Sequence, residues 1–301
     1  MKSSRIIKLC CLTYNLKQKS LSEEQINNIL SQHKQKKFDL YIIATQECER
    51  KTLLNIFYDD KSSFEIKLQK FFGDEYYNLK PITLGGIHLI IFAKAIYKSH
   101  IDNYSNNSIK TGFYGILANK GSVSIKVNIF NFSFLFINTH LIKGKDKLLY
   151  RNNDLNNIYK SICPSINKIN AIIWLGCLNY KVEAELEDFS QAYIKGKELT
   201  LLDKEQMKKE RKNNNEFIFK EFCEGEIKFL PSSKYEEGSN KIDWTNSDNY
   251  PAWTDRIFYK INKNANEKFS LDLIQYDSMH DIVFSDHKPV YSYFNFCYEI
   301  T

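Results

Sequence analysis

The sequence predicts a mixed α/β protein with mostly antiparallel sheets, on three observations. Short runs rich in β-branched and aromatic residues recur along the chain, and segments of helical periodicity lie between them. Two neighbouring runs, VSIKVNIF at 123–130 and FSFLFIN at 132–138, flank Asn131 as paired strands would. No composition break, Pro/Gly-rich linker or repeat divides the 301 residues, so we expect one domain over 1–301.

Composition and charge limit the classes of partner. The chain is 43% hydrophobic and 26% charged, which is ordinary globular composition, and its formal net charge of +6 mildly favours anionic partners. The 7 cysteines are scattered and form no CxxC pair, so a reducing, cytoplasmic compartment is expected. No run approaches the ~18 apolar residues of a bilayer span. We therefore expect a monomer whose membrane contact, if any, is peripheral.

Three segments read as helices. Ser22 and Gln25 form a capping box at the start of an amphipathic segment over 22–36. A second helix is marked by apolar and aromatic positions between 151 and 162, and the charged stretch 201–222 is predicted to be a third, solvated helix. The apolar stretch 82–92 has two interpretations, a loop that touches acyl chains or a buried strand.

Five β-rich runs end in side chains that bind metals or move protons. These ends are Asn15, Glu47, His140, Asn179, and the pair Asp286 and His287. Polar residues commonly close strands, but several such ends on separate strands indicate a cleft at one end of a sheet scaffold.

Two stretches carry a specific resemblance. PAWTDRIFY at 251–259 is similar to the PAWCDRIL signature of the inositol polyphosphate 5-phosphatases, and WLGCLNYK at 174–181 to their WxGDLNYR signature. TYN at 13, ATQE at 44, NTHL at 138 and SDHKPV at 285 also match, in the family's order. The resemblance implies the DNase I-like fold, a four-layer α/β/β/α sandwich whose active cleft lies where the loops of the two sheets meet.

The resemblance also implies a Mg²⁺-dependent attack of water on a phosphate monoester. Glu47 would bind the metal, with the Asn15 amide oxygen beside it, because Mg²⁺ prefers oxygen ligands. His140 would donate to a phosphate oxygen and stabilise the pentacoordinate state. Asn179 would hold the attacked phosphate or the water.

The remaining candidate residues come from other parts of the sequence. Asp286 and His287 would form the second histidine site, and Asp255 would orient the histidine or the metal shell. Lys234 and Lys181 would contact substrate phosphates. Lys120 is open to two interpretations, a cleft residue or a solvated loop lysine.

Cys177 departs from the family pattern, because it replaces the aspartate that positions and activates the water. A neutral thiol, with a reference pKa of ~8.5, is a poor hydrogen-bond acceptor and a poor partner for Mg²⁺. Losing a general base commonly costs ~10²–10⁴-fold in rate. Direct attack by the thiol would need the loop C-x5-R, but the sixth residue after Cys177 is Glu183. A buried apolar cysteine remains the alternative interpretation.

The substrate pocket departs too. Ser233 stands where the family has a phosphate-contacting tyrosine, and Ser247 and Asn249 align with its lysine and arginine. Lys181 replaces a family arginine, which keeps the charge and loses the bidentate fork. Affinity for a 4,5-bisphosphate headgroup should therefore fall, or the ligand should differ.

Three functions compete on this reading. The first is a weakened or retuned phosphatase acting on phosphoinositides or inositol polyphosphates. The second is a catalytically inactive relative that binds phosphoinositide or a protein partner. The third is a nuclease of the same fold. We expect no nucleic-acid partner, because no basic stripe is interleaved with aromatic residues.

Overall fold

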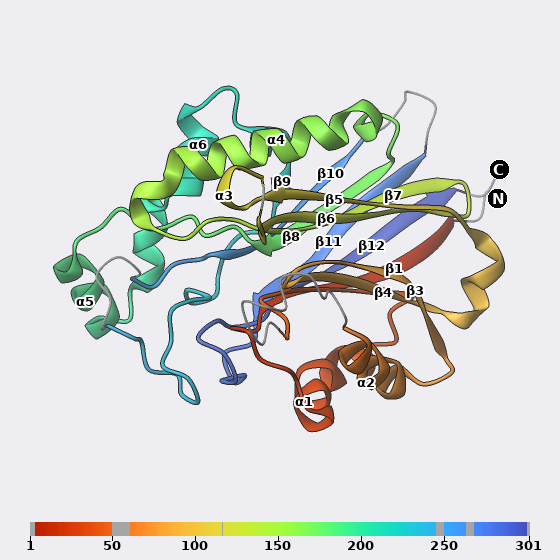
Figure 1. Cartoon of the computed structure of the whole chain (residues 1–301), viewed down its shortest axis with the longest axis horizontal. Helices are drawn as coiled ribbons and strands as arrows, with labels where there is room; N and C mark the ends of the chain where they lie inside the picture. The colour runs from red at the N-terminus through yellow and green to blue at the C-terminus, as the bar shows by residue number, and fades with distance from the viewer. Residues whose placement is uncertain (1–3, 50–60, 116, 245–249, 263–267, 300–301) are drawn as a thin grey trace.

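The computed structural model describes residues 4–49, 61–115, 117–244, 250–262 and 268–299. Two six-stranded sheets pack face to face between outer helices (Figure 1). The first sheet has the order β11-β12-β1-β2-β4-β3, with β1 Ser4–Asn15, β2 Leu40–Gln46, β3 Tyr76–Leu84, β4 Ile87–Lys94, β11 Phe269–Ser278 and β12 Val290–Glu299. The second has the order β5-β6-β7-β8-β10-β9, with β5 Ile101–Thr111, β6 Leu117–Ile129, β7 Phe132–His140, β8 Ala171–Cys177, β9 Cys223–Glu224 and β10 Asp255–Ile261.

The strand pairing confirms the predicted sheet type. β1 pairs with β2 and β7 with β8 in parallel, and the other strand pairs are antiparallel. β6 and β7 form the hairpin predicted around Asn131. The central strands β2 and β8 are buried along their whole length, because each sheet is covered on both faces.

Helices cover the two outer faces. α1 (Glu23–Lys34) and α2 (Ser62–Phe72) pack on the first sheet, and α4 (Leu148–Ile166) packs on the second (Figure 1). The capping box predicted for the first helix is confirmed, since Ser22 Oγ accepts from the Gln25 N–H and the Gln25 side chain accepts from the Ser22 N–H. Shorter helices complete the chain: α3 Gly112–Gly115, α5 Leu186–Ile194, α6 Gln206–Asn213, and 3₁₀-helices at Ala95–His100, Lys145–Lys147, Glu198–Lys204 and Ile218–Glu221.

The largest buried cluster lies between the sheets. Ile42 and Ile91 from the first sheet join Phe136 and Ile173 from the second in one continuous core. Each sheet also has one further buried cluster between its outer face and the helices that cover it. The four-layer α/β/β/α sandwich expected from the resemblance is therefore confirmed.

The prediction of a single solvated helix over 201–222 is wrong. The Glu205 side chain accepts from the Met207 and Lys208 N–H groups, so α6 begins at Gln206, and it ends at Asn213. Met207 and the aromatic residues at 217, 219 and 222 are buried against the second sheet. The spacing of these aromatic residues does not repeat on one helical face, and the charged residues around them concealed their burial.

The apolar stretch at 82–92 is a buried strand rather than a loop available to acyl chains. β4 is buried from Ile87 to Ala93, and the Gly85–Gly86 turn joins it to β3. Among the described residues, no helix combines the length and the apolarity that a bilayer crossing requires.

Candidate active site

A cleft of ≈ 190 Å³ lies at the edge where the central strands end. Asn15 closes β1 opposite Gln46 of β2, and His140 closes β7 opposite Cys177 of β8. The lining consists of polar and charged side chains: Asn15, Lys17, Gln18, Glu47, Lys120, His140, Lys143, Asn179, Lys181, Ser233, Lys234, Asp286 and His287. The strand ends expected to converge do so.

Gly176 fixes the spacing of β7 and β8 at this edge. Its φ is 145°, and a Cβ there would lie 2.0 Å from the Thr139 carbonyl oxygen. Only glycine permits this approach. His140 and Cys177 are consequently adjacent on neighbouring strands.

Glu47 has an unusual backbone conformation, with φ of 49°. The turn before β4 presses against it: the Cys48 N–H donates to the Gly86 carbonyl at 2.9 Å, and a Cβ on Gly86 would lie 3.0 Å from the Glu47 Cα. Left-handed conformations of residues other than glycine are uncommon and concentrate at functional sites. This conformation holds the carboxylate at the cleft, with 29% of the side chain exposed.

Glu47 lies beside a histidine and a lysine. Glu47 Oε1 is 3.7 Å from His140 Nε2, and Lys120 Nζ is 2.6 Å from the same ring nitrogen. Lys120 is therefore a cleft residue and not a solvated loop lysine. On the other side, Asn15 Oδ1 accepts from the Lys17 N–H at 3.0 Å and keeps a second lone pair.

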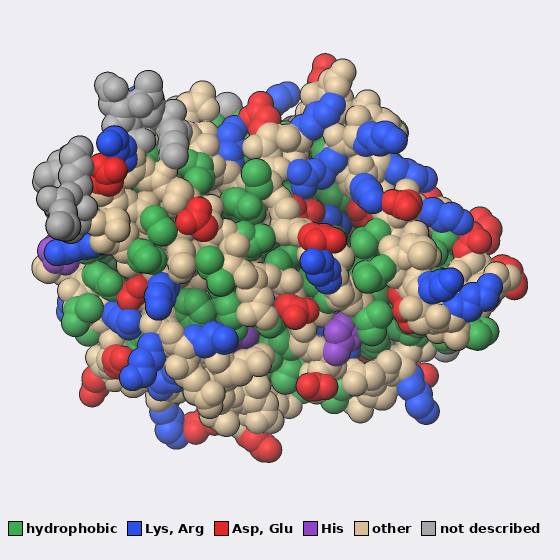
Figure 2. Space-filling view, turned by 180° about the vertical axis from the view of Figure 1, so that it is seen from behind, with side chains coloured by type: hydrophobic (Ala, Val, Ile, Leu, Met, Phe, Trp, Pro, Cys, Tyr) green, Lys and Arg blue, Asp and Glu red, His purple; other side chains and the backbone are tan. Residues whose placement is uncertain are grey.

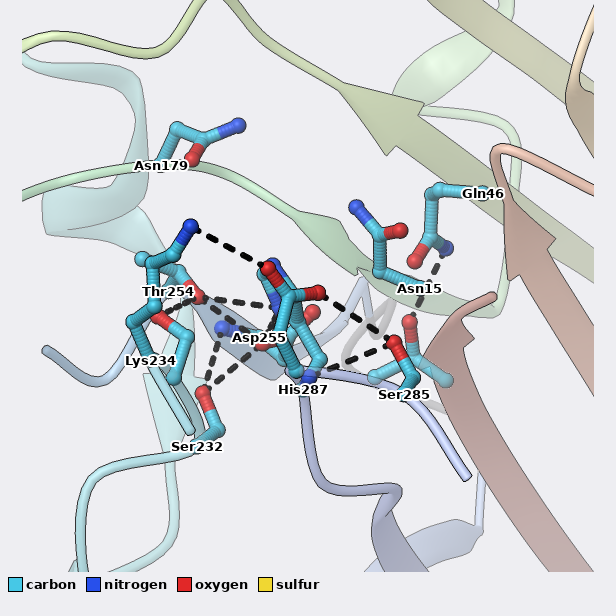
Figure 3. Close-up of polar contacts among 12 residues, drawn as sticks. Asn15, Gln46, Asn179, Ser232, Lys234, Thr254, Asp255, Ser285 and His287 are labelled. Carbon is cyan, nitrogen blue, oxygen red and sulfur yellow. Dashed lines mark hydrogen bonds and ion pairs between the residues drawn. The ribbon is translucent and has the colours of Figure 1, made fainter. Parts of the chain in front are cut away.

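Asp255 and His287 form a hydrogen-bonded pair behind the cleft (Figure 3). His287 Nδ1 lies 2.7 Å from Asp255 Oδ2, and the same oxygen accepts from the hydroxyls of Ser232 and Thr254, both at 2.8 Å. Burial alone would lower the pKa of His287, but the Asp255 carboxylate outweighs it and raises that pKa. The pair holds the imidazole with its other ring nitrogen toward the cleft.

Cys177 is fully buried at the end of β8, in register with Asp255 of β10. Burial, together with the Asp255 charge, raises the pKa of the thiol well above its usual range, against smaller lowering effects from Lys120 and an Asn15 hydrogen bond. The side chain is thus both a buried cysteine and a neighbour of the site. It is a protonated thiol at neutral pH.

Asn179 also has a left-handed backbone, with φ of 58°. Asparagine tolerates this conformation better than most residues. Its Nδ2 donates to the Leu141 carbonyl at 2.8 Å, which leaves the amide oxygen for the cleft (Figure 3).

The lysines of the cleft differ in environment. Lys181 is 7% exposed, and burial lowers its pKa to about 8. Lys234 Nζ lies 3.4 Å from Asp243 and 3.5 Å from Asp286, and Lys17 Nζ lies 3.4 Å from the same oxygen of Asp286. Asp286 therefore faces cations, and its pKa is lowered by His287, Lys17 and Lys234 against the raising effect of burial.

Of the eleven predicted site residues, nine line the cleft, and Asp255 and Cys177 lie directly behind it. Asp255, expected to orient the histidine or the metal shell, makes the contact to His287 Nδ1, whereas Asp286, expected beside His287 at the second histidine site, contacts lysines. The Ser247 and Asn249 positions lie outside the described residues.

Sequence reasoning missed several residues. Lys17 and Lys143 line the cleft, two residues after Asn15 and three after His140. Their closeness to strand ends was the available signal. Thr254 lies inside PAWTDRIFY and Ser232 precedes Ser233, but nothing in the sequence indicated that their hydroxyls donate to Asp255.

Comparisons with known proteins agree with this geometry. Residues 12–293 match the model of the Endonuclease/Exonuclease/phosphatase family 2. The type IV inositol polyphosphate 5-phosphatase 11 of Arabidopsis thaliana is 29% identical over 293 residues, with 95% of this chain and 82% of that protein covered. The phosphatidylinositol 3,4,5-trisphosphate 5-phosphatase 2A of Danio rerio is 29% identical over 276 residues, with 85% of this chain and 21% of that protein covered.

A solved structure gives the same result. The inositol polyphosphate 5-phosphatase domain of a synaptojanin, in complex with inositol (1,4)-bisphosphate and a calcium ion, superposes with a TM-score of 0.84 at 25% identity, covering 99% of this chain and 86% of that one. The chain spans about a fifth of the Danio rerio relative's length, at 21%. On the extent of the family match, this chain belongs to the endonuclease/exonuclease/phosphatase family 2, with the inositol polyphosphate 5-phosphatases among its relatives.

Proposed function

We propose that this chain is a Mg²⁺-dependent phosphatase of phosphoinositides or inositol polyphosphates whose turnover is weakened by Cys177. The observation that carries the proposal is the convergence of Glu47, His140, Asn179 and the Asp255–His287 pair on one cleft. These residues come from separate strand ends, and folding alone brings them together.

The donor atoms at Glu47 and Asn15 suit Mg²⁺. One carboxylate and one amide oxygen at the same cleft are hard ligands, and Mg²⁺ needs few protein ligands because it keeps several waters and binds substrate phosphate. When bound, the ion would polarise a phosphate oxygen. The left-handed backbone of Glu47 supports this role, since such strain persists where the surroundings hold a residue for function.

The chain's own cations and donors would hold the phosphate. Lys120 lies next to His140 in the cleft, and we expect its ammonium to turn to a phosphate oxygen, which frees Nε2 of His140. Once that nitrogen carries a proton, it can donate to the phosphate. Asn179 and Lys181 follow β8: the Asn179 amide oxygen can accept from the attacking water, and Lys181 adds a charge for the phosphate. Charge-assisted hydrogen bonds of this kind strengthen as negative charge develops in the transition state.

The Asp255–His287 pair would act on the same phosphate. Asp255 fixes the tautomer by accepting from Nδ1, so that Nε2 is the nitrogen available to the substrate. Ser232 and Thr254 in turn hold the carboxylate, so the ring is positioned before a ligand arrives.

Cys177 is the observation that favours the second candidate, an inactive relative that binds the same headgroups. A protonated thiol without net charge cannot take the proton of an attacking water as an aspartate does. The binding half of the site is less affected, because five lysines and two carboxylates, Glu47 and Asp286, line the cleft. This excess of positive charge suits a ligand with more than one phosphate group.

Phosphate release distinguishes the two candidates. The natural chain would be incubated with inositol 1,4,5-trisphosphate and with vesicles containing phosphatidylinositol 4,5-bisphosphate, with Mg²⁺ or with a chelator. We expect slow release that needs the metal and is lost in His287→Gln. Binding of the headgroup without any release above that variant would instead support the inactive binder, and neither binding nor release would reject both.

The nuclease alternative has less support. Figure 2 shows acidic side chains among the lysines and arginines of the face that it draws, rather than a continuous basic stripe. Long-range attraction of a nucleic-acid backbone depends on clustered positive charge. We expect no nicking of plasmid DNA, and nicking that disappears in His287→Gln would reverse this assignment.

A further inference from the structure

We propose that Cys177, Asp255 and His287 form a second metal site, for a thiophilic divalent cation of the Zn²⁺ class, distinct from the oxygen ligands of Glu47 and Asn15. This site goes beyond the proposed phosphatase function, and its test does not need turnover. It engages the same His287 ring, so a bound cation would compete with the role proposed for that ring at the substrate. Substitution of the family aspartate by a thiol has created this site.

The three side chains lie together although they come from different parts of the fold. Cys177 ends β8, Asp255 begins β10, and His287 lies in the loop before β12. The Cys177 sulfur, a carboxylate oxygen of Asp255 and a ring nitrogen of His287 all lie within 4.8 Å of one another. Among the described residues, no other three potential metal ligands of these types lie so close together. Ligands of tetrahedral zinc lie about 3.5 Å apart, so side-chain rotations suffice to close the site.

Asp255 gives independent evidence for a missing cation. Its side chain is fully buried, and Oδ2 accepts three hydrogen bonds, from Ser232, Thr254 and His287. Within the part of the chain that the structure describes, Oδ1 has no hydrogen-bond partner. A buried carboxylate oxygen without a partner is costly and calls for an explanation. A cation between Oδ1, the sulfur and the imidazole would provide the partner.

The ligand types select the metal. Thiolate and imidazole ligands favour Zn²⁺ and related ions, whereas Mg²⁺ prefers the carboxylate and amide oxygens at Glu47 and Asn15. Binding replaces the thiol proton by the metal and releases that proton to solvent.

Asp255 is already oriented for this purpose. Ser232 and Thr254 fix one carboxylate oxygen, as outer-shell hydrogen bonds do at natural metal sites. His287 lines the cleft, which gives an ion a path to the buried sulfur. Three protein ligands would leave the fourth position of the metal open to the cleft.

Cobalt(II) provides the test, because a thiolate ligand gives Co²⁺ an intense near-ultraviolet charge-transfer band that oxygen ligands do not give. Chelator-treated protein in excess Mg²⁺, which occupies hard sites, would be titrated with Co²⁺ under a reductant without thiol groups. We expect a band that saturates at one Co²⁺ per chain and is removed by equimolar Zn²⁺.

Variants locate the band. Cys177→Ser and Cys177→Asp should abolish it, and His287→Gln should weaken Co²⁺ affinity by at least about 100-fold, since even outer-shell changes cost 10–100-fold. Cys223→Ser is the matched control, because Cys223 is an exposed free cysteine that does not line the cleft. Circular dichroism would establish that each variant is folded.

Two results would overturn the proposal. One is the absence of a charge-transfer band in the natural chain. The other is a band that survives in Cys177→Ser and Cys177→Asp or disappears in Cys223→Ser, which would show adventitious binding at a surface thiol. Both results are independent of phosphate release, so they leave the proposed phosphatase function to its own experiment.

Discussion

Asp255 and Arg256 are neighbours in the chain, but their side chains lie on opposite faces of β10 and have different surroundings. Both are buried, at 0% and 3% exposure. Arg256 grips Glu224 through Nε and Nη2 at 2.5 and 2.7 Å and lies 3.4 Å from Glu205. Asp255 lies behind the cleft; its Oδ2 accepts three hydrogen bonds, and its Oδ1 has no hydrogen-bond partner among the described residues.

We infer that Arg256 serves stability and that Asp255, the preceding residue, serves function. On the Arg256 face, the guanidinium forms ion pairs with Glu224 and Glu205, and Glu205 also caps α6. On the Asp255 face, one buried carboxylate oxygen has no hydrogen-bond partner within the described ranges, which costs stability unless an ion uses it. Because successive side chains of a strand point to opposite faces of the sheet, one motif can supply both an ion-paired residue and a site residue.

The largest expected effect tests the Arg256 face. Arg256→Ala leaves Glu205 buried without this cation and Glu224 with Arg211, 3.5 Å away, as its remaining cation in the described part of the chain, so the free energy of unfolding should fall by about 3–5 kcal/mol. Urea unfolding followed by circular dichroism measures it. Lys70→Ala, which breaks the exposed pair with Glu23, is the control and should change the midpoint far less. Equal losses in the two variants would contradict the comparison.

The next effect tests the cleft. Lys181→Met should weaken inositol 1,4,5-trisphosphate binding by about 1.5–3 kcal/mol, the usual worth of a hydrogen bond to a charged group, and leave the unfolding midpoint the same or higher. Isothermal titration calorimetry gives the affinity. An unchanged affinity would remove Lys181 from the ligand site.

The pH dependence sharpens this second prediction. Burial lowers the pKa of Lys181 to about 8, so its ammonium, and with it ligand affinity, should be lost as the pH rises through about 8. Lys181→Arg should keep its affinity across that range, because a guanidinium stays charged. Since the folded-state pKa is below the unfolded one, the charge costs stability below about pH 8, and this cost disappears as the pH rises toward the unfolded value.

The smallest effect compares the two faces directly. Asp255→Asn retains an oxygen that accepts from Ser232 and Thr254, so we expect the free energy of unfolding to fall by only about 1 kcal/mol, less than for Arg256→Ala. Urea unfolding of the two variants in parallel measures the difference. A larger loss for Asp255→Asn would make Asp255 the structural member of the pair.

Much of the fold could be predicted, because apolar periodicity and the two signature motifs are local properties of the sequence. The capping box at Ser22 and the hairpin at Asn131 are examples. The 201–222 segment failed because burial there depends on the second sheet, which is distant in sequence, and not on a local pattern.

The motifs indicated which residues lie at or behind the cleft, but not which of these side chains contact one another. They indicated Asp255, Asp286 and His287 but left open whether Asp255 orients the histidine or the metal shell, since that depends on where the loop before β12 lies relative to β10. The left-handed Glu47 and the unpartnered Asp255 Oδ1 likewise follow from contacts with remote segments.

The most direct test of the account is phosphate release by the natural chain and by Cys177→Asp, with the same Mg²⁺ and the same inositol 1,4,5-trisphosphate and phosphatidylinositol 4,5-bisphosphate substrates. The account predicts a gain of about 10²–10⁴-fold, because the carboxylate would supply the missing proton acceptor beside His287. No gain in a folded Cys177→Asp variant that still binds the headgroup would contradict the claim that this cleft is a phosphatase site limited by its thiol.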